Sequence, residues 1–92
     1  MKRYNFHNTS CGWNYFVEFA STGKVRFGRY HTNGHVNTDE QKTDWVDDKK
    51  SSLDITDVTA FAAAKESGKE ISETLKFNAN VECQRGVEML TI

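Results

Sequence analysis

In three runs within the first thirty residues, aromatic and β-branched side chains stand at every second position. The alternating runs are Tyr4 with Phe6, then Trp13, Tyr15, Val17 and Phe19, then Val25 with Phe27. Successive side chains of an extended chain point to opposite faces, so this period predicts three half-buried β-strands. Residues 8–12 and 21–23, which separate the runs, are rich in turn-forming residues, so we expect an antiparallel meander.

A further turn signal, Asn33-Gly34, follows the third run. Asn-Gly is a preferred pair for a two-residue hairpin, so the third strand is expected to fold back into a short fourth strand. Residues 37–52 are polar apart from Trp45 and Val46. This stretch predicts a surface loop with one strand-like piece around Trp45.

The segment Asp54–Ser67 carries the helix signal. It is rich in alanine, Ile55, Val58 and Phe61 recur every three residues, and Gly68 suits the helix end. Alternation returns in residues 75–79 and 87–92, with residues 84–86 as a hairpin loop between two more strands. The expected fold is α+β, an antiparallel sheet in the order β-β-β-(β)-α-β-β with one helix packed on one face. With 92 residues we expect one domain, 1–92.

The charges are divided unevenly along the chain. Residues 1–38 hold five basic residues and one acidic residue, residues 39–92 hold seven basic and twelve acidic residues, and the net charge is −1. The total excludes a wholly basic nucleic-acid binder and a wholly acidic DNA mimic. No apolar run approaches the ~20 residues of a membrane helix, and the N-terminus lacks the apolar core of a secretory signal. With two cysteines far apart, the chain is expected in the reducing cytoplasm.

Candidate reactive residues are few. His31 and His35 flank the predicted turn, and only composition offers His7, Cys11 or Asp39 as further ligands, so we expect no metal site. Cys11 with His7 suggests a thiolate–imidazole pair, but no third residue to orient the base is apparent, and Cys83 is interpreted as a small core residue. No phosphate-binding glycine motif occurs. The sequence therefore predicts a protein that is not an enzyme and has no cofactor.

A basic and aromatic strand is the main candidate for binding. If Val25 and Phe27 face the core, Lys24, Arg26, Gly28 and Tyr30 face outward together, while Arg29 points inward unless the strand ends or bulges there. Phe16 is expected on the same outward face of the neighbouring strand. Cations with exposed aromatic rings are typical of interfaces. The predicted partner-binding residues are Phe16, Lys24, Arg26, Arg29 and Tyr30.

The polar loop contains a second candidate patch. Its acidic residues are Asp39, Glu40, Asp44, Asp47 and Asp48, interleaved with lysines. Their spacing does not fit a calcium loop, because no glycine lies among them. They form either a solvated loop or an acidic patch that faces a basic surface of a partner.

The short chain has no proline and is rich in asparagine, threonine and aromatic residues. In size and in sheet-plus-helix style it is similar to the small anti-CRISPR inhibitor proteins of bacteriophages. This resemblance implies a non-enzymatic protein that docks on a host nucleoprotein complex, such as a CRISPR effector with its guide RNA, in the bacterial cytoplasm. It would block nucleic-acid access or pairing sterically. Two alternatives are a small single-strand nucleic-acid-binding domain using Arg26, Tyr30 and Phe16, and a structural protein that oligomerises through an exposed strand edge.

Overall fold

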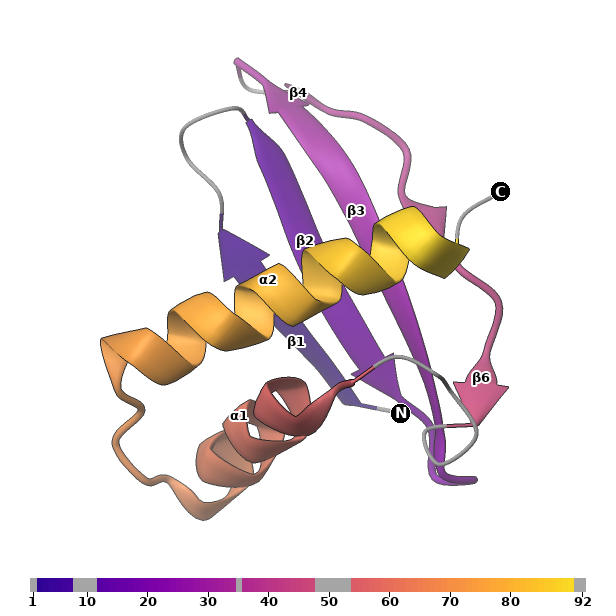
Figure 1. Cartoon of the computed structure of the whole chain (residues 1–92). Helices are drawn as coiled ribbons and strands as arrows, with labels where there is room; N and C mark the ends of the chain where they lie inside the picture. The colour runs from indigo at the N-terminus through magenta and orange to yellow at the C-terminus, as the bar shows by residue number, and fades with distance from the viewer. Residues whose placement is uncertain (1, 8–11, 35, 48–53, 91–92) are drawn as a thin grey trace.

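A computed structural model of the chain describes residues 2–7, 12–34, 36–47 and 54–90. Three long strands come first: β1 (Lys2–His7), β2 (Trp13–Phe19) and β3 (Lys24–Asn33). Three two-residue strands follow: β4 (Val36–Asn37), β5 (Gln41–Lys42) and β6 (Val46–Asp47). The chain then forms two helices, α1 (Thr56–Ser67) and α2 (Glu73–Leu90), which lie on one side of the sheet (Figure 1).

The predicted antiparallel meander is confirmed. Tyr4 lies opposite Val17, and Val17 lies opposite Phe27, so the apolar residues of the three strands share one face. The turn between β2 and β3 closes with a hydrogen bond from the Gly23 amide to the Ala20 carbonyl (3.1 Å), and Gly23 adopts φ +83°. A positive φ is favourable only for glycine, as the turn chemistry predicted.

The second edge of β3 pairs with all three short strands. β4 pairs with the end of β3, so the predicted fourth strand is present, but Asn33 is the last residue of β3 rather than a turn residue. β5 lies opposite Gly28 and Arg29, and β6 lies opposite Lys24 and Val25. The polar segment thus forms two short strands where one was expected.

Helix α1 lies where the sequence predicts it. Before its first turn, the Asp54 carboxylate accepts hydrogen bonds from the amide (3.0 Å) and the hydroxyl (2.6 Å) of Thr56. Gly68 ends the helix in the left-handed conformation with φ +70°. Val58 and Phe61 are the buried residues of this helix, as expected.

The region after α1 departs from the prediction. Residues 75–79 and 87–90 were expected in two strands joined by a loop at residues 84–86, but Glu73–Leu90 is one continuous helix. The correct signal is the spacing of four between Ala79, Cys83 and Val87, which places all three on one helical face, and all three are buried. The fold is therefore α+β with an antiparallel sheet, and it has two helices instead of one.

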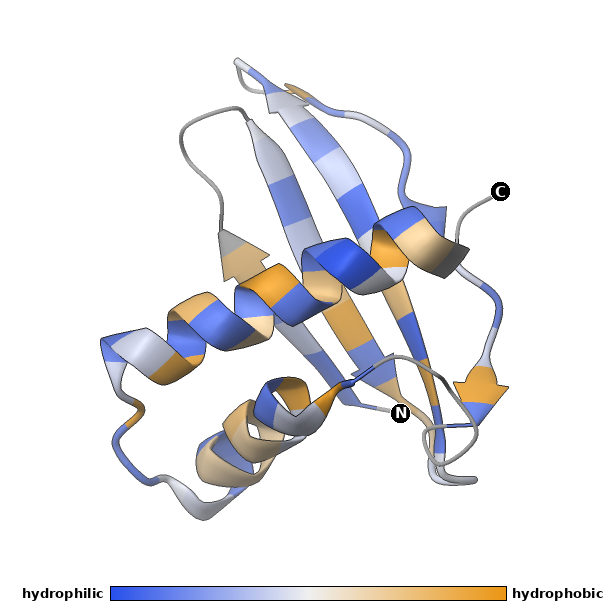
Figure 2. Cartoon of the chain, in the orientation of Figure 1, coloured by the Kyte–Doolittle hydropathy of each residue, from blue (hydrophilic) through white to orange (hydrophobic). Residues whose placement is uncertain are grey.

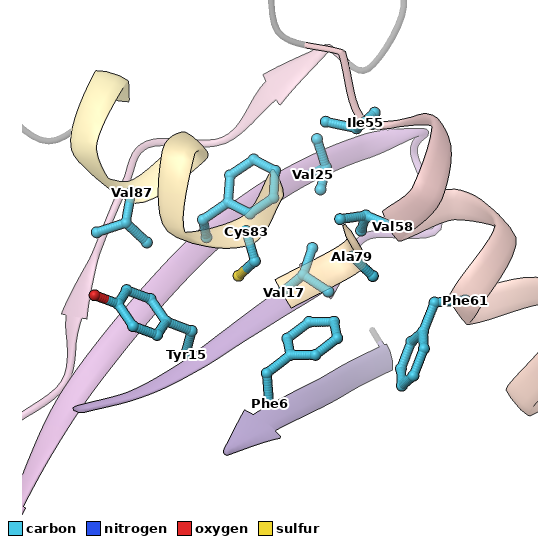
Figure 3. Close-up of a cluster of buried hydrophobic side chains, with 11 residues drawn as sticks. Phe6, Tyr15, Val17, Val25, Ile55, Val58, Phe61, Ala79, Cys83 and Val87 are labelled. Atoms are coloured by element: carbon cyan, nitrogen blue, oxygen red, sulfur yellow. The ribbon is translucent and has the colours of Figure 1, made fainter. Parts of the chain in front are cut away.

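One cluster of apolar side chains fills the space between the helices and the sheet. It comprises Phe6, Tyr15, Val17, Val25, Phe27, Ile55, Val58, Phe61, Ala79, Cys83 and Val87, drawn in Figure 3. Figure 2 shows that the most hydrophobic parts of β2 and β3 are the last residues of β2 and the first residues of β3. These parts of the strands lie behind the helices in this view. Gly86 allows α2 to approach closely, because a Cβ atom there would lie 2.6 Å from Cδ2 of Phe27. Among the described residues, neither helix has the length and apolar character to cross a membrane.

A buried carboxylate joins the two helices. Glu82 of α2 is only 7% exposed, and its two oxygens accept the amides of Asp57 (3.1 Å) and Val58 (2.8 Å) in the first turn of α1. These amides have no partner within their own helix. Burial raises the pKa of Glu82, and the two backbone hydrogen bonds offset this effect only in part.

The raised pKa of Glu82 makes a prediction about stability and pH. A carboxyl group whose pKa is higher in the folded state stabilises the fold fully below its unfolded pKa, and this stabilisation is lost as the pH rises through the folded pKa. In Glu82→Gln this titration is absent, so as the pH rises above the ordinary glutamate pKa of 4.5 the free energy of unfolding should shift in favour of the variant relative to the parent. Chemical unfolding at several pH values measures this shift, with Glu88→Gln, at an exposed position of the same helix, as the control. Parallel pH profiles for Glu82→Gln and the parent would contradict it.

Candidate binding surface

The face of the sheet opposite the helices is the candidate binding surface, which we call the open face. Directly opposed residues of antiparallel strands share a face. The pairs Arg3–Glu18, Glu18–Arg26, Phe16–Gly28, Asn14–Tyr30, Gly28–Lys42 and Lys24–Asp47 therefore define it. The predicted outward register of Lys24, Arg26, Gly28 and Tyr30 is confirmed. In the described part of the chain, both helices lie on the other face (Figure 1).

Phe16 lies on this face but is not exposed, so the prediction of an exposed Phe16 ring was wrong. Its exposed fraction is 0%. The ring lies across Gly28, where a Cβ atom would come within 2.0 Å of Cζ of Phe16. The Arg3 guanidinium lies over the ring, with Cζ of Arg3 4.0 Å from the ring centroid. The alternating pattern shows which face Phe16 is on, but it does not show that Gly28 on the next strand leaves room for the Phe16 ring.

Glu18 is the centre of an ion network on the open face. It is 1% exposed and accepts a hydrogen bond from Nε of Arg26 (2.6 Å) and two from Nε and Nη2 of Arg3 (3.2 and 3.1 Å). Burial alone would raise the pKa of Glu18, but the bonds from Arg26 and Arg3 outweigh burial and lower it. Glu18 is therefore held as a carboxylate between two cations.

The network continues to the segment after β3. Arg3 also donates two hydrogen bonds to Glu40, at 2.7 and 3.0 Å, and Lys42 lies 3.5 Å from Glu40. The hydrogen bond from Arg3 lowers the pKa of Glu40. The Arg26 guanidinium lies over the Trp45 ring, 4.3 Å from the centroid. Each arginine is thus fixed by a carboxylate and an aromatic ring together.

Two members of the predicted set remain available on this face. Lys24 is exposed and Tyr30 is half-buried, and the side chain of neither makes a hydrogen bond or ion pair with the residues that the structure describes. Asp47 lies opposite Lys24 in the register, and Asn14 lies opposite Tyr30. Lys24 and Tyr30 can therefore contact a partner without breaking an internal contact.

Arg29 lies apart from the other predicted residues. It shares the helix-side face with Tyr15 and Gln41, as strict register predicts, and it is half-buried. Its Nε donates to Oε1 of Gln41 (2.9 Å), and its guanidinium lies 4.5 Å from the Trp13 ring centroid. The structure therefore does not join Arg29 to Lys24, Arg26 and Tyr30 in one surface.

The acidic residues of the polar segment do not form one separate patch. Glu40 belongs to the ion network, Asp47 faces Lys24 across the strands, and Asp39 and Asp44 are exposed. Asp48 lies outside the described residues. The open face consequently combines the cations Arg3, Lys24, Arg26 and Lys42 with the carboxylates Glu18, Glu40 and Asp47.

Sequence reasoning missed Arg3, Glu18 and Trp45 as parts of this surface. A usable signal was present for Glu18, since it is the sole acidic residue of the first 38 positions. Its place in the alternation puts it on the face of Arg3 and Arg26. Trp45 gave no such signal, because its contact with Arg26 depends on how the polar segment returns to β3.

The remaining reactive candidates fall elsewhere. The His31 ring meets the Trp13 ring edge to face at 5.0 Å, while His35, Cys11 and the His7 side chain lie outside the described part. Cys83 is buried and donates its thiol hydrogen to the Phe16 carbonyl (3.1 Å), and burial raises the pKa of this thiol. No group of three potential metal ligands gathers among the described residues.

Comparison of the chain with protein-family models, with curated proteins and with solved structures gave no match. Any assignment of function therefore depends on the open face itself.

Proposed function

We propose that this chain is a non-enzymatic binding protein that docks through its open face on a nucleoprotein complex of a bacterial host. In this proposal the bound protein blocks the access or pairing of nucleic acid sterically. The observation that carries the proposal is that arginines and aromatic rings are fixed in place on a sheet face that no described helix covers. A solvated face does not require such fixed side chains.

Fixed side chains favour binding because less conformational entropy is lost at the interface. The Arg3–Phe16 and Arg26–Trp45 stacks, at 4.0 and 4.3 Å, hold both guanidinium groups before any partner arrives. Arginine and aromatic residues are enriched in the centres of protein interfaces. The open face thus has the residue types and the rigidity of a docking surface.

The balance of charge favours a partner of mixed charge over bare nucleic acid. Binding to the phosphate backbone depends on cations that replace its counterions. Arg3 and Arg26 are already paired with Glu18, and Phe16 offers no ring surface for a base. These contacts give more support to a protein or nucleoprotein partner than to the alternative of a single-strand nucleic-acid-binding domain.

The proposed partner class is a CRISPR effector complex with its guide RNA, in the host cytoplasm. Such a complex combines protein surface with exposed nucleic acid. A face with both cations and carboxylates is complementary to a surface of that kind. The inhibition would need no catalytic residue and no cofactor.

The test is a binding titration against a panel of purified CRISPR effector–guide complexes, with free single-stranded RNA as a separate arm. Tyr30→Ala should weaken binding about 30-fold if Tyr30 is an anchor, since such residues contribute ~2 kcal/mol or more. Lys24→Glu should slow association, and the effect should shrink as salt is added. The matched control is Lys69→Glu, at an exposed position between the helices, which should bind like the parent.

Circular dichroism verifies that each variant is folded, and a target-cleavage assay tests whether binding inhibits the complex. Binding to free RNA alone, with a steep salt dependence, would favour the nucleic-acid-binding alternative. If Lys69→Glu is as damaging as Lys24→Glu and Tyr30→Ala has no effect, the open face is not the docking surface.

A further inference from the structure

A groove opens beside β1, on the helix side of the sheet. It has a volume of about 430 Å³ and is lined by Asn5 and Phe6 of β1, Phe61 and Lys65 of α1, and Glu73, Lys76, Phe77 and Asn80 of α2. Figure 3 shows the Phe6 and Phe61 rings side by side, and their centroids are 4.9 Å apart. Three elements thus meet around one concave site that is separate from the open face.

The sheet is narrower than the helix layer at this edge. In the described part of the chain, β1 pairs with β2 alone, so its other edge presents unpaired backbone amides and carbonyls. Helix α2 packs on β2 and β3, and its first turns extend past β1 (Figure 1). Among the described residues, β1 therefore offers a backbone edge beneath these turns with which a further strand could pair.

The groove contains two groups that lack partners within the described chain. Phe77 is 67% exposed although it belongs to a helix that packs on the sheet. Oδ1 of Asn80 is buried and has no hydrogen-bond donor. A buried acceptor without a donor costs about 1–3 kcal/mol, and a bound molecule that supplies a donor removes this cost.

The charge of the groove favours an acidic occupant. Glu73 pairs with Lys76 at 3.2 Å, while Lys65 makes no ion pair with a described residue and lies 5.7 Å above the Phe61 ring. A second copy of this chain, paired through its own β1, would bring two such lysine-bearing rims together. The groove is therefore more complementary to a peptide with carboxylates beside an apolar residue than to the β1 edge of a second copy of this chain.

We propose that an extended acidic peptide segment of a partner protein adds to β1 as a further strand. Its backbone pairs with the outer edge of β1, and every second side chain enters the groove. A large apolar side chain contacts Phe6, Phe61 and Phe77, and a neighbouring carboxylate reaches Lys65. The site takes a peptide by its strand conformation and is independent of the nucleoprotein docking proposed for the open face.

The experiment is a selection of random nonapeptides displayed on phage against the immobilised protein. The expected hits have an aromatic or aliphatic residue at alternate positions and aspartate or glutamate between them. Synthetic copies of the hits are then titrated against the parent, Phe77→Ser and Met89→Ser. Met89 is the matched control, since it lies on the same helix, is 53% exposed and is absent from the groove lining.

Phe77→Ser should weaken the hits about tenfold or more, and Met89→Ser should leave their affinity unchanged. Because Phe77 is exposed, both variants should remain folded, which circular dichroism checks. Methylating the backbone amides of a hit at alternate positions should abolish binding in one of the two registers and leave it intact in the other, as strand pairing requires.

Three outcomes would overturn the proposal. The first is that no peptide is enriched, and the second is that Phe77→Ser and Met89→Ser weaken binding equally. The third is that the parent sediments as a dimer that Phe77→Ser converts to a monomer, which would make the occupant a second copy of the chain.

Discussion

Glu18→Ala is expected to lower the free energy of unfolding by about 3 kcal/mol, because it leaves two cations without their shared carboxylate. Glu18 is 1% exposed, whereas the side chains of Arg3 and Arg26 are 29% and 21% exposed. This partial exposure places the expected loss at the lower end of the range for a broken buried pair. Urea unfolding followed by circular dichroism measures the loss.

The control for this prediction is Glu40→Ala. Glu40 also binds Arg3, but its side chain is 34% exposed, so its removal should cost less than about 1 kcal/mol. Equal losses for Glu18→Ala and Glu40→Ala would show that burial of Glu18 does not determine its contribution to stability.

The same carboxylate should make the protein sensitive to acid. The pKa of Glu18 is lowered in the fold, so its stabilisation is present above the unfolded pKa and is lost as the pH falls through the folded pKa. The Glu18→Ala variant lacks this titration, and its difference from the parent should shrink below about pH 4.

Gly28→Ala is expected to destabilise the protein by about 3 kcal/mol, at the upper end of the usual range for an overpacked core. The new Cβ atom would lie 2.0 Å from Cζ of Phe16 and 2.5 Å from Cε1. The ring is fully buried beneath Arg3, so it can move away from a new side chain only by displacing that guanidinium from Glu18. Guanidinium unfolding of the variant and the parent measures this effect.

A second substitution tests the cause of this loss. Phe16→Leu replaces the ring with a smaller side chain, which leaves room for the methyl group that Gly28→Ala introduces. The double variant Gly28→Ala with Phe16→Leu should therefore be more stable than the sum of the single effects by about 1 kcal/mol or more. Additive effects would mean that the ring of Phe16 is not what excludes a side chain at position 28.

The N-terminal half of the fold could be predicted from the sequence because its signals are local. Strand alternation fixed the faces of Tyr4, Val17 and Phe27, and turn residues such as Gly23 marked where the chain reverses. The same register separated Arg29 from Arg26. Each of these inferences needs only the residues next to one another in the chain.

The region after α1 was mispredicted because one short pattern fits two structures. Leu75, Phe77 and Ala79 alternate as a strand requires, while Ala79, Cys83 and Val87 recur as a helix requires. Gly86 was interpreted as a turn residue, but it lies inside α2, where its missing side chain admits the ring of Phe27. That contact joins residues nearly sixty positions apart, so no local sequence pattern indicates it.

The candidate surface was predicted in part for the same reason. Register placed Lys24, Arg26 and Tyr30 on one face, but exposure depends on what lies across that face. Neither the stacking of Arg3 on Phe16 nor that of Arg26 on Trp45 follows from alternation.

The order of elements along the chain has a consequence for biosynthesis. The meander ends at Asn33, and Val87, whose helix covers the apolar side of that meander, follows more than fifty positions later. At ~5–20 residues per second, a ribosome needs several seconds to make that stretch. Throughout that interval the growing polypeptide has an apolar sheet surface without the helix that will shield it. Helix α1 can shield part of this surface first, through Val58 and Phe61, but the cover is complete only when α2 leaves the exit tunnel. A ribosome stalled before that point would display a nascent chain with exposed apolar sheet surface.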